Sequence, residues 1–512
     1  MTSSCSSPRT PQRSLLASAV LLVCALALAP VLGLGWFAFG QGSALAALQL
    51  GSDGPQQVGF TLALVLVVGL FTAALGSATG WLTARCAFPG RRWLRIAQLL
   101  PLACPSYLLA ATWIDLGSRF GWRVHGFAPA VLVMVLSTYS YVFLLSTESF
   151  SVSGRRQLEA CRSLGVGPWG SFGRVALPMA LPAIGAGVAL AGMEVVNELG
   201  AVQLLGVPTL SSGILMRWQQ DGEPQSAVGL ALLALLIVAL LVGAERNLRR
   251  RSRCWNLGNE GNDDQLWSLS GSRRWLGQLL CLLPPLISLG LPLLWMGVSW
   301  DQLRSENVLE LLALTGRSFS LALLAALLTL LAGLLLAIAR RWIPNLLVQR
   351  LSFVAGLGYA IPGTVLALAL MLLGGPLALA PLLLLIWGYA DRFLAVAKGG
   401  IDAALERIPP SVDEAATSLG QSWFGVLQRV HLPLLRGPLL VGALLVFVDT
   451  VKELPLSFAL RPFDFDTLAV RVYQYASDER VGAALVPALL ILLLGLVAAV
   501  ALIPSLERLE RR

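Results

Sequence analysis

Long apolar stretches separated by short polar segments dominate the chain. Several stretches lack Asp, Glu, Lys and Arg altogether, and these lie at 14–52, 54–84, 96–114, 224–244, 275–300, 351–390 and 481–506. Each is long enough for a helix that crosses a bilayer, which needs about 20 apolar residues. The pattern predicts spans at 14–39, 58–84, 96–117, 127–148, 177–203 and 226–244, and further spans at 276–299, 316–339, 347–373, 377–398, 432–460 and 481–505. We therefore expect an all-α polytopic membrane protein with about 12 transmembrane helices.

Composition and charge agree with this class. The chain is 56% hydrophobic and 13% charged, whereas soluble domains carry about 25% charged residues. A net charge of +9 would suit a nucleic-acid partner, but the basic residues fall in alternate loops, so we expect no nucleic acid. The positive-inside rule places these loops and both termini in the cytoplasm, with the chain in the cell inner (plasma) membrane. The first apolar run is too long for a cleaved signal and is expected to stay as a helix.

The two halves of the chain are repeats. The stretch Glu159 to Gly165 matches Glu414 to Gly420, 255 residues later, and at the same spacing Pro178 meets Pro433. An even number of predicted spans separates the copies, which gives them one orientation and predicts two parallel six-helix repeats. The expected parts are a first half, a polar cytoplasmic linker and a second half, at 1–244, 245–274 and 275–512.

Each copy of the repeated stretch lies in a cytoplasmic loop, at 153–172 and 411–428. Both copies predict a short helix, a glycine turn and a second helical stretch that ends at a proline opening the next span. In the second copy, Ser411 and Glu414 have the spacing of a capping box, which the first copy lacks. A connector loop would explain one copy, but two copies with matched flanks indicate a surface offered to a partner.

The pattern E-A-A-x-x-x-G in such a loop resembles the signature of binding-protein-dependent ABC importer permeases. The first copy has Cys161 where the second Ala is usual, and the second copy has Ala416. The resemblance implies the ABC type I importer permease fold, in which these loops are coupling helices that dock on two copies of an ABC ATPase subunit. The ATPase-coupling residues that it implies are Glu159, Ala160, Gly165, Glu414, Ala415 and Gly420.

The chain has no ATP site of its own. A phosphate-binding loop needs Gly-Lys followed by Ser or Thr, and the two lysines, Lys398 and Lys452, follow Ala and Val. ATP is therefore expected on a separate partner, and we expect the chain to be a translocation subunit and not an enzyme.

Four carboxylates in or near the predicted spans are candidates for a translocation path. They form two pairs with four-residue spacing, which puts each pair on one helical face: Glu194 with Glu198, and Asp449 with Glu453. Four such groups around an outer vestibule suit a cationic or hard-metal cargo, although no metal ligand set can be assigned. The alternative is a structural role at the outer interface, with Glu453 paired to Lys452 or Arg461.

Three other ionisable residues are expected to have structural roles. Asp391 and Arg392, at the cytoplasmic end of a predicted span, are expected to form a local ion pair. His431 is expected to serve at a helix start and not as a metal ligand. No cofactor is expected on the chain.

Further stretches resemble the ferric iron subgroup of these permeases, which also fuses two halves in one chain. They are "NELGAVQLLGVPTLSSGILMRW", "KELPLSFALRPFDFDTLAVRVYQYASDE" and "YAIPGTVLALALM". The resemblance implies uptake of Fe³⁺ delivered by a periplasmic or lipid-tethered solute-binding protein. Permeases for thiamine, polyamines, sulfate or phosphonate stay open as alternatives. An ion-coupled secondary transporter would need carboxylates nearer the middle of the membrane, and a membrane-embedded transferase or hydrolase lacks a catalytic constellation.

Overall fold

The chain folds into two compact units, and each unit draws on both halves of the sequence. The computed structural model describes residues 11–40, 51–152, 155–219, 221–222, 224–254, 266–298, 308–343, 346–356, 358–478 and 480–510. Unit one comprises Met1–Gly42, Gly316–Thr467 and Val500–Arg512, and unit two comprises Ser43–Thr315 and Leu468–Ala499. The expected halves describe the sequence repeat and stay a prediction, because packing and sequence divide the chain differently.

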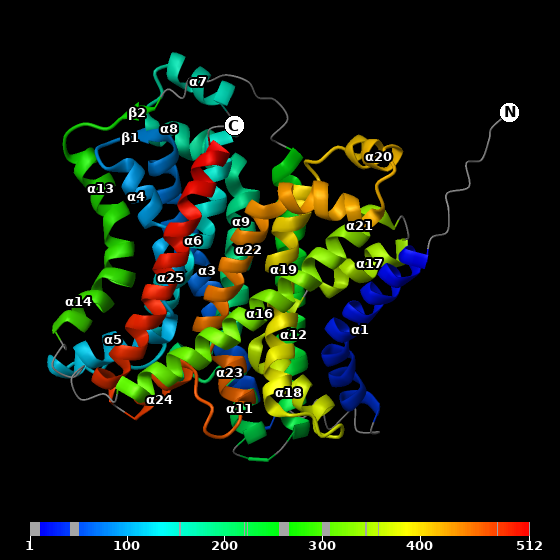
Figure 1. Cartoon of the computed structure of the whole chain (residues 1–512). Coiled ribbons are helices and arrows are strands. Elements are labelled where there is room, and N and C mark those ends of the chain that lie inside the picture. The colour runs from blue at the N-terminus through cyan, green and yellow to red at the C-terminus, as the bar shows by residue number, and fades with distance from the viewer. Residues whose placement is uncertain are drawn as a thin grey trace. The chain divides into compact units, whose positions relative to one another are not determined.

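Unit one is helical and is built mainly from the second half (Figure 1). Its elements are α1 (Pro11–Gly40), most of α16 (Val308–Trp342), α17 (Leu346–Ala355), a 3₁₀ turn η4 (Gly358–Ala360), α18 (Gly363–Gly374), α19 (Pro381–Leu405), α20 (Pro410–Ser418), α21 (Trp423–Val426), a π-helical turn η5 (Leu427–His431), α22 (Leu432–Lys452) and α23 (Pro455–Leu460). Helix α19 packs against α22, and α1 packs against α17 and α18. The first helix of the chain therefore completes the packing of second-half helices.

Unit two is built mainly from the first half. Its elements from the first half are α3 (Gly54–Arg85), β1 (Cys86–Ala87), α4 (Arg91–Ala97), a 3₁₀ turn η1 (Leu100–Ala103), α5 (Ser106–Arg119), α6 (Phe127–Val152), α7 (Arg155–Ser163), α8 (Pro168–Ser171), a π-helical turn η2 (Phe172–Ala176), α9 (Leu177–Asn197), α10 (Gly200–Leu204), α11 (Leu210–Gln219) and α12 (Pro224–Cys254). Later residues add β2 (Trp267–Ser268), α13 (Ser272–Pro285), a π-helical turn η3 (Leu286–Gly290), α14 (Leu291–Val298), α24 (Leu468–Ser477) and most of α25 (Val481–Glu510). Strands β1 and β2 pair in parallel, with Cys86 opposite Trp267.

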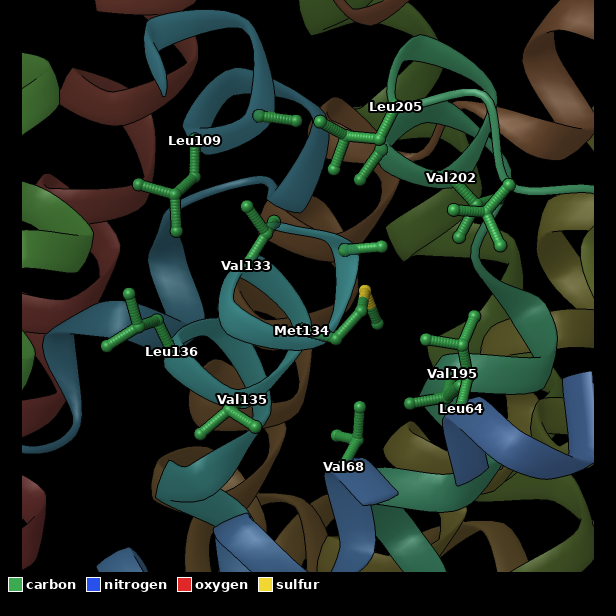
Figure 2. Packing of buried hydrophobic residues seen from close by; sticks show 14 residues of the cluster. Leu64, Val68, Leu109, Val133, Met134, Val135, Leu136, Val195, Val202 and Leu205 are labelled. Atoms are coloured by element: carbon green, nitrogen blue, oxygen red, sulfur yellow. The ribbon is translucent and has the colours of Figure 1, made fainter. Parts of the chain in front are cut away.

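The core of unit two lies among α3, α6 and α9. Figure 2 shows Val133 and Met134 of α6 packed among side chains of α3 and α9. The backbones approach closely at two glycines: a Cβ on Gly76 or on Gly187 would lie 2.7 Å from an atom of Val142. Small residues allow membrane helices to pack at such short range.

The all-α, polytopic prediction is confirmed, and the twelve-span arrangement stays a prediction. Among the described residues, eight helices are long and apolar enough to cross a membrane, or nine if one bent pair is counted. The predicted span at 96–117 is that pair: it breaks at Pro105, and Arg91–Ala103 meets Ser106–Arg119 at 90°. Pro362 breaks the span predicted at 347–373 in the same way, since both prolines hold an extended backbone with ψ of 137° and 139°.

Candidate functional site

The two repeated loops, at 153–172 and 411–428, have the same succession of elements. Helices α7 and α20 each end at a glycine with positive φ, +73° at Gly165 and +79° at Gly420. Beyond each glycine come a short helix, a π-helical turn and a long helix with proline near its start. The predicted glycine turns are thus confirmed. In both, an amide reaches back five residues to a carbonyl of the helix, 2.9 Å from Val166 and 3.1 Å from Gln421, as in a Schellman cap.

The capping box predicted in the second loop is wrong. Helix α20 begins at Pro410, and Pro409 is its N-cap with an extended backbone (ψ 143°). Proline suits the first helical position because its missing N–H has no partner there anyway. Ser411 and Glu414 therefore both lie inside the helix, where they cannot bond across its first turn.

Asp413 links α20 to the end of the long helix α16 through contacts with Arg341, Trp342 and His431, which we call the anchor. One of its carboxylate oxygens, Oδ2, accepts from Arg341 Nε at 2.7 Å and from Trp342 Nε1 at 3.3 Å. The other, Oδ1, lies 3.1 Å from Nε2 of the buried His431. Arg341 also donates to the Leu405 carbonyl at 2.8 Å, at the end of α19. Motion of α20 is therefore tied to α16, α19 and the start of α22.

This anchor belongs to the second copy. At the 255-residue spacing, the positions of Asp413, Arg341 and His431 hold Leu158, Cys86 and Ala176. Sequence reasoning missed the anchor because its members lie outside the repeated motif and far apart in the chain. The charged Asp413 beside the motif was the one available signal.

Both loops expose their motif residues and a pair of large apolar side chains. Glu159, Ala160, Glu414 and Ala415 are exposed. Leu164 and Leu419, at equivalent positions, are 80% and 81% exposed, and Trp169 and Phe424, also equivalent, are exposed too. Exposed apolar groups at matched positions among polar residues mark an interaction surface.

The predicted pairing of carboxylates on one helical face is wrong. Helices α9 and α22 end at Asn197 and Lys452, one residue before Glu198 and Glu453. Both glutamates have extended backbones, with ψ of 131° and 121°. Their side chains therefore leave the face that carries Glu194 and Asp449.

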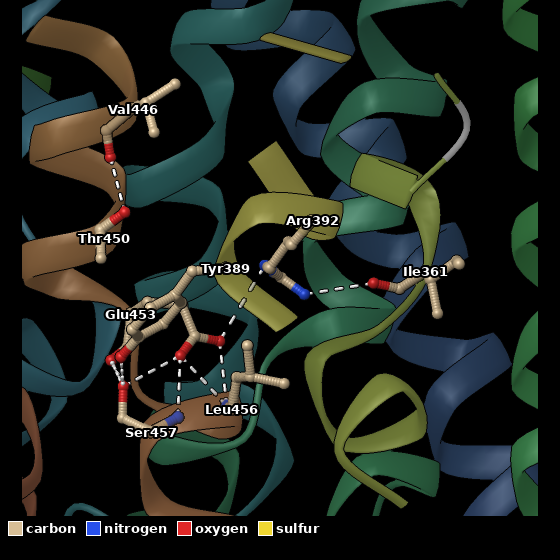
Figure 3. A network of polar contacts seen from close by, with 8 residues as sticks. All are labelled: Ile361, Tyr389, Arg392, Val446, Thr450, Glu453, Leu456 and Ser457. Atoms are coloured by element: carbon tan, nitrogen blue, oxygen red, sulfur yellow. Dashed lines mark hydrogen bonds and ion pairs between the residues drawn. The ribbon is translucent and has the colours of Figure 1, made fainter. Parts of the chain in front are cut away.

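Glu453 is the centre of a buried polar network in unit one (Figure 3). Its carboxylate accepts from the backbone N–H groups of Leu456 and Ser457, each at 3.0 Å, and thereby caps α23. Its Oε1 lies 3.9 Å from Nε of Arg392, which also donates to the Ile361 carbonyl at 3.1 Å. The hydroxyl groups of Tyr389 and Ser457 lie 2.5 Å apart and extend the network.

The expected partners of Glu453 are engaged elsewhere. Lys452 pairs with Asp449 at 2.9 Å, and Arg461 pairs with Asp466. The expected partners are therefore wrong, and Arg392 is the cation nearest to Glu453.

Glu198 caps α10 in unit two without an arginine. Its Oε1 accepts from the N–H of Ala201 at 2.8 Å, and its Oε2 accepts from the Ser106 hydroxyl at 2.5 Å. The residue corresponding to Ser106 in the second copy is Gly363, where a Cβ would lie 2.9 Å from Glu453 Oε1. Glycine there leaves room for Arg392, whose Nη1 would lie 3.1 Å from such a Cβ.

The expected ion pair between Asp391 and Arg392 is wrong. Arg392 turns to Glu453, and both oxygens of the buried Asp391 have no hydrogen-bond partner in the described part of the chain. Neighbours along a helix point in different directions, so adjacency did not produce contact. Nowhere in the described ranges do three or more His, Cys, Asp or Glu residues gather to hold a metal ion.

Comparisons with known proteins agree with the loops. Residues 76–253 match the family described as "Binding-protein-dependent transport system inner membrane component". The chain is 26% identical over 444 residues to "Fe(3+)-transport system permease protein FbpB 2" of Haemophilus influenzae, which covers 85% of this chain and 86% of that protein. It is 29% identical over 212 residues to "Molybdenum transport system permease protein ModB" of Escherichia coli, covering 36% of this chain and 90% of that protein. It is 28% identical over 198 residues to "Sulfate transport system permease protein CysT" of Escherichia coli, covering 35% of this chain and 72% of that protein.

The relatives agree that the protein is a permease, but their names differ in cargo. One of the three spans most of the chain. The resemblance predicted from the loops is confirmed. The chain is a multi-pass membrane protein whose residues 76–253 match the binding-protein-dependent transport permeases, and it is similar along most of its length to a permease of the ferric iron type.

Proposed function

We propose that the chain is the membrane-spanning subunit of an ATP-driven importer that takes up ferric iron from a solute-binding protein. The observation that carries this proposal is the pair of equivalent exposed surfaces on the two cytoplasmic loops. Each surface offers the motif residues and two apolar side chains, so two copies of an ATPase subunit can dock, one on each loop. Both termini and both loops then lie in the cytoplasm, on the inner face of the cell inner membrane.

The anchor at Asp413 supports a mechanical role for α20. Because its carboxylate contacts Arg341 and Trp342 at the end of α16, a displacement of α20 acts on that helix directly. Packing adds to this link, since the Trp342 and Trp423 rings are edge to face with centroids 4.8 Å apart. Closure of an ATPase pair would therefore move the helices and open the path outward.

Ferric iron is proposed because the relative named for Fe³⁺ spans 85% of this chain, with both halves fused. Glu198 and Glu453 are buried helix caps, whereas Glu194 and Asp449 are less buried, so these two are the carboxylates to test first for contact with cargo. An oxyanion is the second candidate, since relatives named for molybdenum and sulfate transport match about a third of the chain. The buried guanidinium of Arg392 would suit an anion better than a cation.

A reconstitution experiment tests the class and the cargo together. The chain and its ATPase are placed in liposomes, and ATP hydrolysis is measured with binding protein that is empty, ferric-loaded or oxyanion-loaded. Stimulation by the ferric form alone supports the proposal, and stimulation by the oxyanion form alone favours the second candidate. Uptake that survives without ATP and collapses with an ionophore would instead indicate an ion-coupled transporter.

A second experiment tests the docking surfaces. Replacing Leu164 and Leu419 with Ser should reduce capture of the ATPase subunit by the detergent-solubilised chain. Phe463→Ser is the matched control, because Phe463 is a highly exposed apolar residue too but lies in a loop that the expected topology puts outside. Capture that Leu164→Ser and Leu419→Ser leave unchanged would contradict docking at these loops.

A further inference from the structure

A basic, tryptophan-bearing surface lies where α4 meets the start of α13 in unit two. Trp93 of α4 is 78% exposed and Trp275 of α13 is 69% exposed. Arg92 and Arg273 beside them are exposed as well. The two helices are held together, since Gln278 Nε2 donates to the Pro89 carbonyl at 3.0 Å. We call this region the α4–α13 surface.

A hollow of about 350 Å³ lies on the α4 side of this surface. Its lining residues are Ala87, Phe88, Gly90, Arg91, Arg92, Trp93 and Leu266. The guanidinium of Arg91 is turned inward, because it donates to the carbonyls of Thr83 and Ala84 at the end of α3, at 2.6 and 3.1 Å. Arg92 therefore supplies the exposed charge at the hollow.

A second guanidinium belongs to α13. Arg274 lies one turn before Gln278 on α13, hence on the face that meets the start of α4. Its Nε is buried and has no hydrogen-bond partner among the described residues. A buried donor without a partner is costly, and an acceptor from outside the protein would remove that cost.

The described segments that form this surface carry no acidic residue. Residues 86–114 and 266–298 contain neither Asp nor Glu. Elsewhere an exposed arginine does have such partners, as Arg340 has in Asp402 and Glu406 at 3.3 and 3.1 Å. Among the described residues, the α4–α13 surface therefore has a local excess of positive charge.

The sequence repeat shows that the fold does not need this chemistry. At the 255-residue spacing, Pro89 meets Pro344, but Arg91, Arg92 and Trp93 meet Leu346, Leu347 and Val348. A helix, α17, follows that second proline as α4 follows the first. The same element therefore forms with apolar residues, and the basic set in the first copy has another purpose.

The surface lies at the membrane boundary next to the first coupling loop. Arg85, at the end of α3, donates to the Phe150 and Ser151 carbonyls at the end of α6, at 2.6 and 3.1 Å. Chain 153–172 follows directly, so the proposed function places this boundary in the cytoplasm. Below it, α13 exposes a row of apolar side chains suited to acyl chains: Leu276, Leu279, Leu280 and Leu283.

We propose that the α4–α13 surface binds the phosphate headgroup of an anionic phospholipid of the cytoplasmic leaflet. Arg92 and Arg274 meet the phosphate, while Trp93 and Trp275 lie at the level of the headgroups, where tryptophan is enriched. Basic pockets between helices on this side of a membrane suit such headgroups. The proposal relies on the proposed function only for the side of the membrane.

Native mass spectrometry of the full chain in detergent tests the proposal. The chain is titrated with phosphatidylglycerol, with phosphatidylcholine as the neutral comparison. Wild type should bind phosphatidylglycerol in preference, and Arg92→Leu with Arg274→Leu should bind it about 30-fold more weakly, because each basic residue near an anionic surface contributes roughly fivefold. The double change Arg92→Lys with Arg274→Lys keeps the charge and should retain most of the binding.

A matched control separates a site from general charge. Arg350→Leu with Arg436→Leu removes two exposed arginines of unit one and should bind phosphatidylglycerol as wild type does.

Equal loss in both double variants, or equal binding of phosphatidylcholine, would overturn the proposal. So would full competition by millimolar inorganic phosphate, which indicates a free-anion site. Loss of ATPase capture with lipid binding unchanged would reassign the surface to that protein partner. Lipid binding is measured without the ATPase, so a negative result in this assay can be distinguished from failure of the proposed function.

Discussion

The carboxylate of Glu453 balances a guanidinium that unit one buries, and this makes Glu453→Ala a sharp test of the polar network. Side-chain exposures of Arg392 and Glu453 are 7% and 4%, with 3.9 Å between Nε and Oε1. Removing the carboxylate leaves Arg392 with its bond to the Ile361 carbonyl alone among the contacts described above. It also uncaps the N–H groups of Leu456 and Ser457.

The expected cost follows from these groups. Removing one partner of a buried ion pair costs about 3–5 kcal/mol, because the remaining charge stays buried. Glu198 in unit two has only neutral donors, from Ser106 and Ala201, so Glu198→Ala should cost about 1–3 kcal/mol. The two glutamates cap equivalent helices, and the difference between the two variants isolates the contribution of Arg392.

Unfolding of the full chain in detergent, monitored by circular dichroism against denaturant, gives the comparison. Glu453→Ala should lower the midpoint clearly more than Glu198→Ala. Adding Arg392→Met to Glu453→Ala should recover part of the loss, because it removes the unpaired charge. Equal losses in the two single variants, or no recovery in the double variant, would refute the reasoning from the buried pair.

Three further outcomes are expected. Gly420→Ala should weaken capture of the ATPase subunit, since the residue has φ +79° and a left-handed alanine costs about 1–2 kcal/mol; Gly437→Ala, with open space and no positive φ, should not. Asp413→Ala should raise amide hydrogen exchange in α20 and lower ATP hydrolysis stimulated by binding protein, and unchanged exchange would argue against the anchor. Gly187→Ala should lower the thermal midpoint by overpacking worth about 1–3 kcal/mol, whereas Gly243→Ala, which meets nothing within 4 Å, should leave it unaltered or raise it.

The sequence predicted the elements that depend on local chemistry. Apolar runs identified most helices, and the glycine turns were correct because Gly165 and Gly420 supply a conformation that other residues resist. The breaks at Pro105 and Pro362 were missed, although proline was visible, because an unbroken apolar run outweighed it. Apolar length measures transfer into lipid, whereas a helix also needs a continuous series of backbone hydrogen bonds.

The candidate site was predicted where residues act through the backbone and missed where they act through distant partners. Placing Glu194 and Glu198 on one face assumed that the helix continued, but it ends between them. Pairing Asp391 with Arg392 assumed that neighbours meet, whereas the guanidinium reaches a residue 61 positions later, at 453. Contacts of this kind are set by how α19 packs against α22, which no local pattern encodes.

The two copies share the same local backbone features and differ in their buried charged residues. Both break a predicted span at a proline, end the helix of the repeated loop at a left-handed glycine, insert a π-helical turn and cap a short helix with a glutamate. Only the second copy pairs its glutamate with a buried arginine and links its loop helix, α20, through an aspartate to α16. Backbone features depend on one or two residues and survive drift after duplication, whereas an ion pair needs two simultaneous changes in a low-dielectric setting. The backbone features found in both copies therefore indicate what both halves need in common. The buried charges found in the second copy alone show where the two halves have diverged.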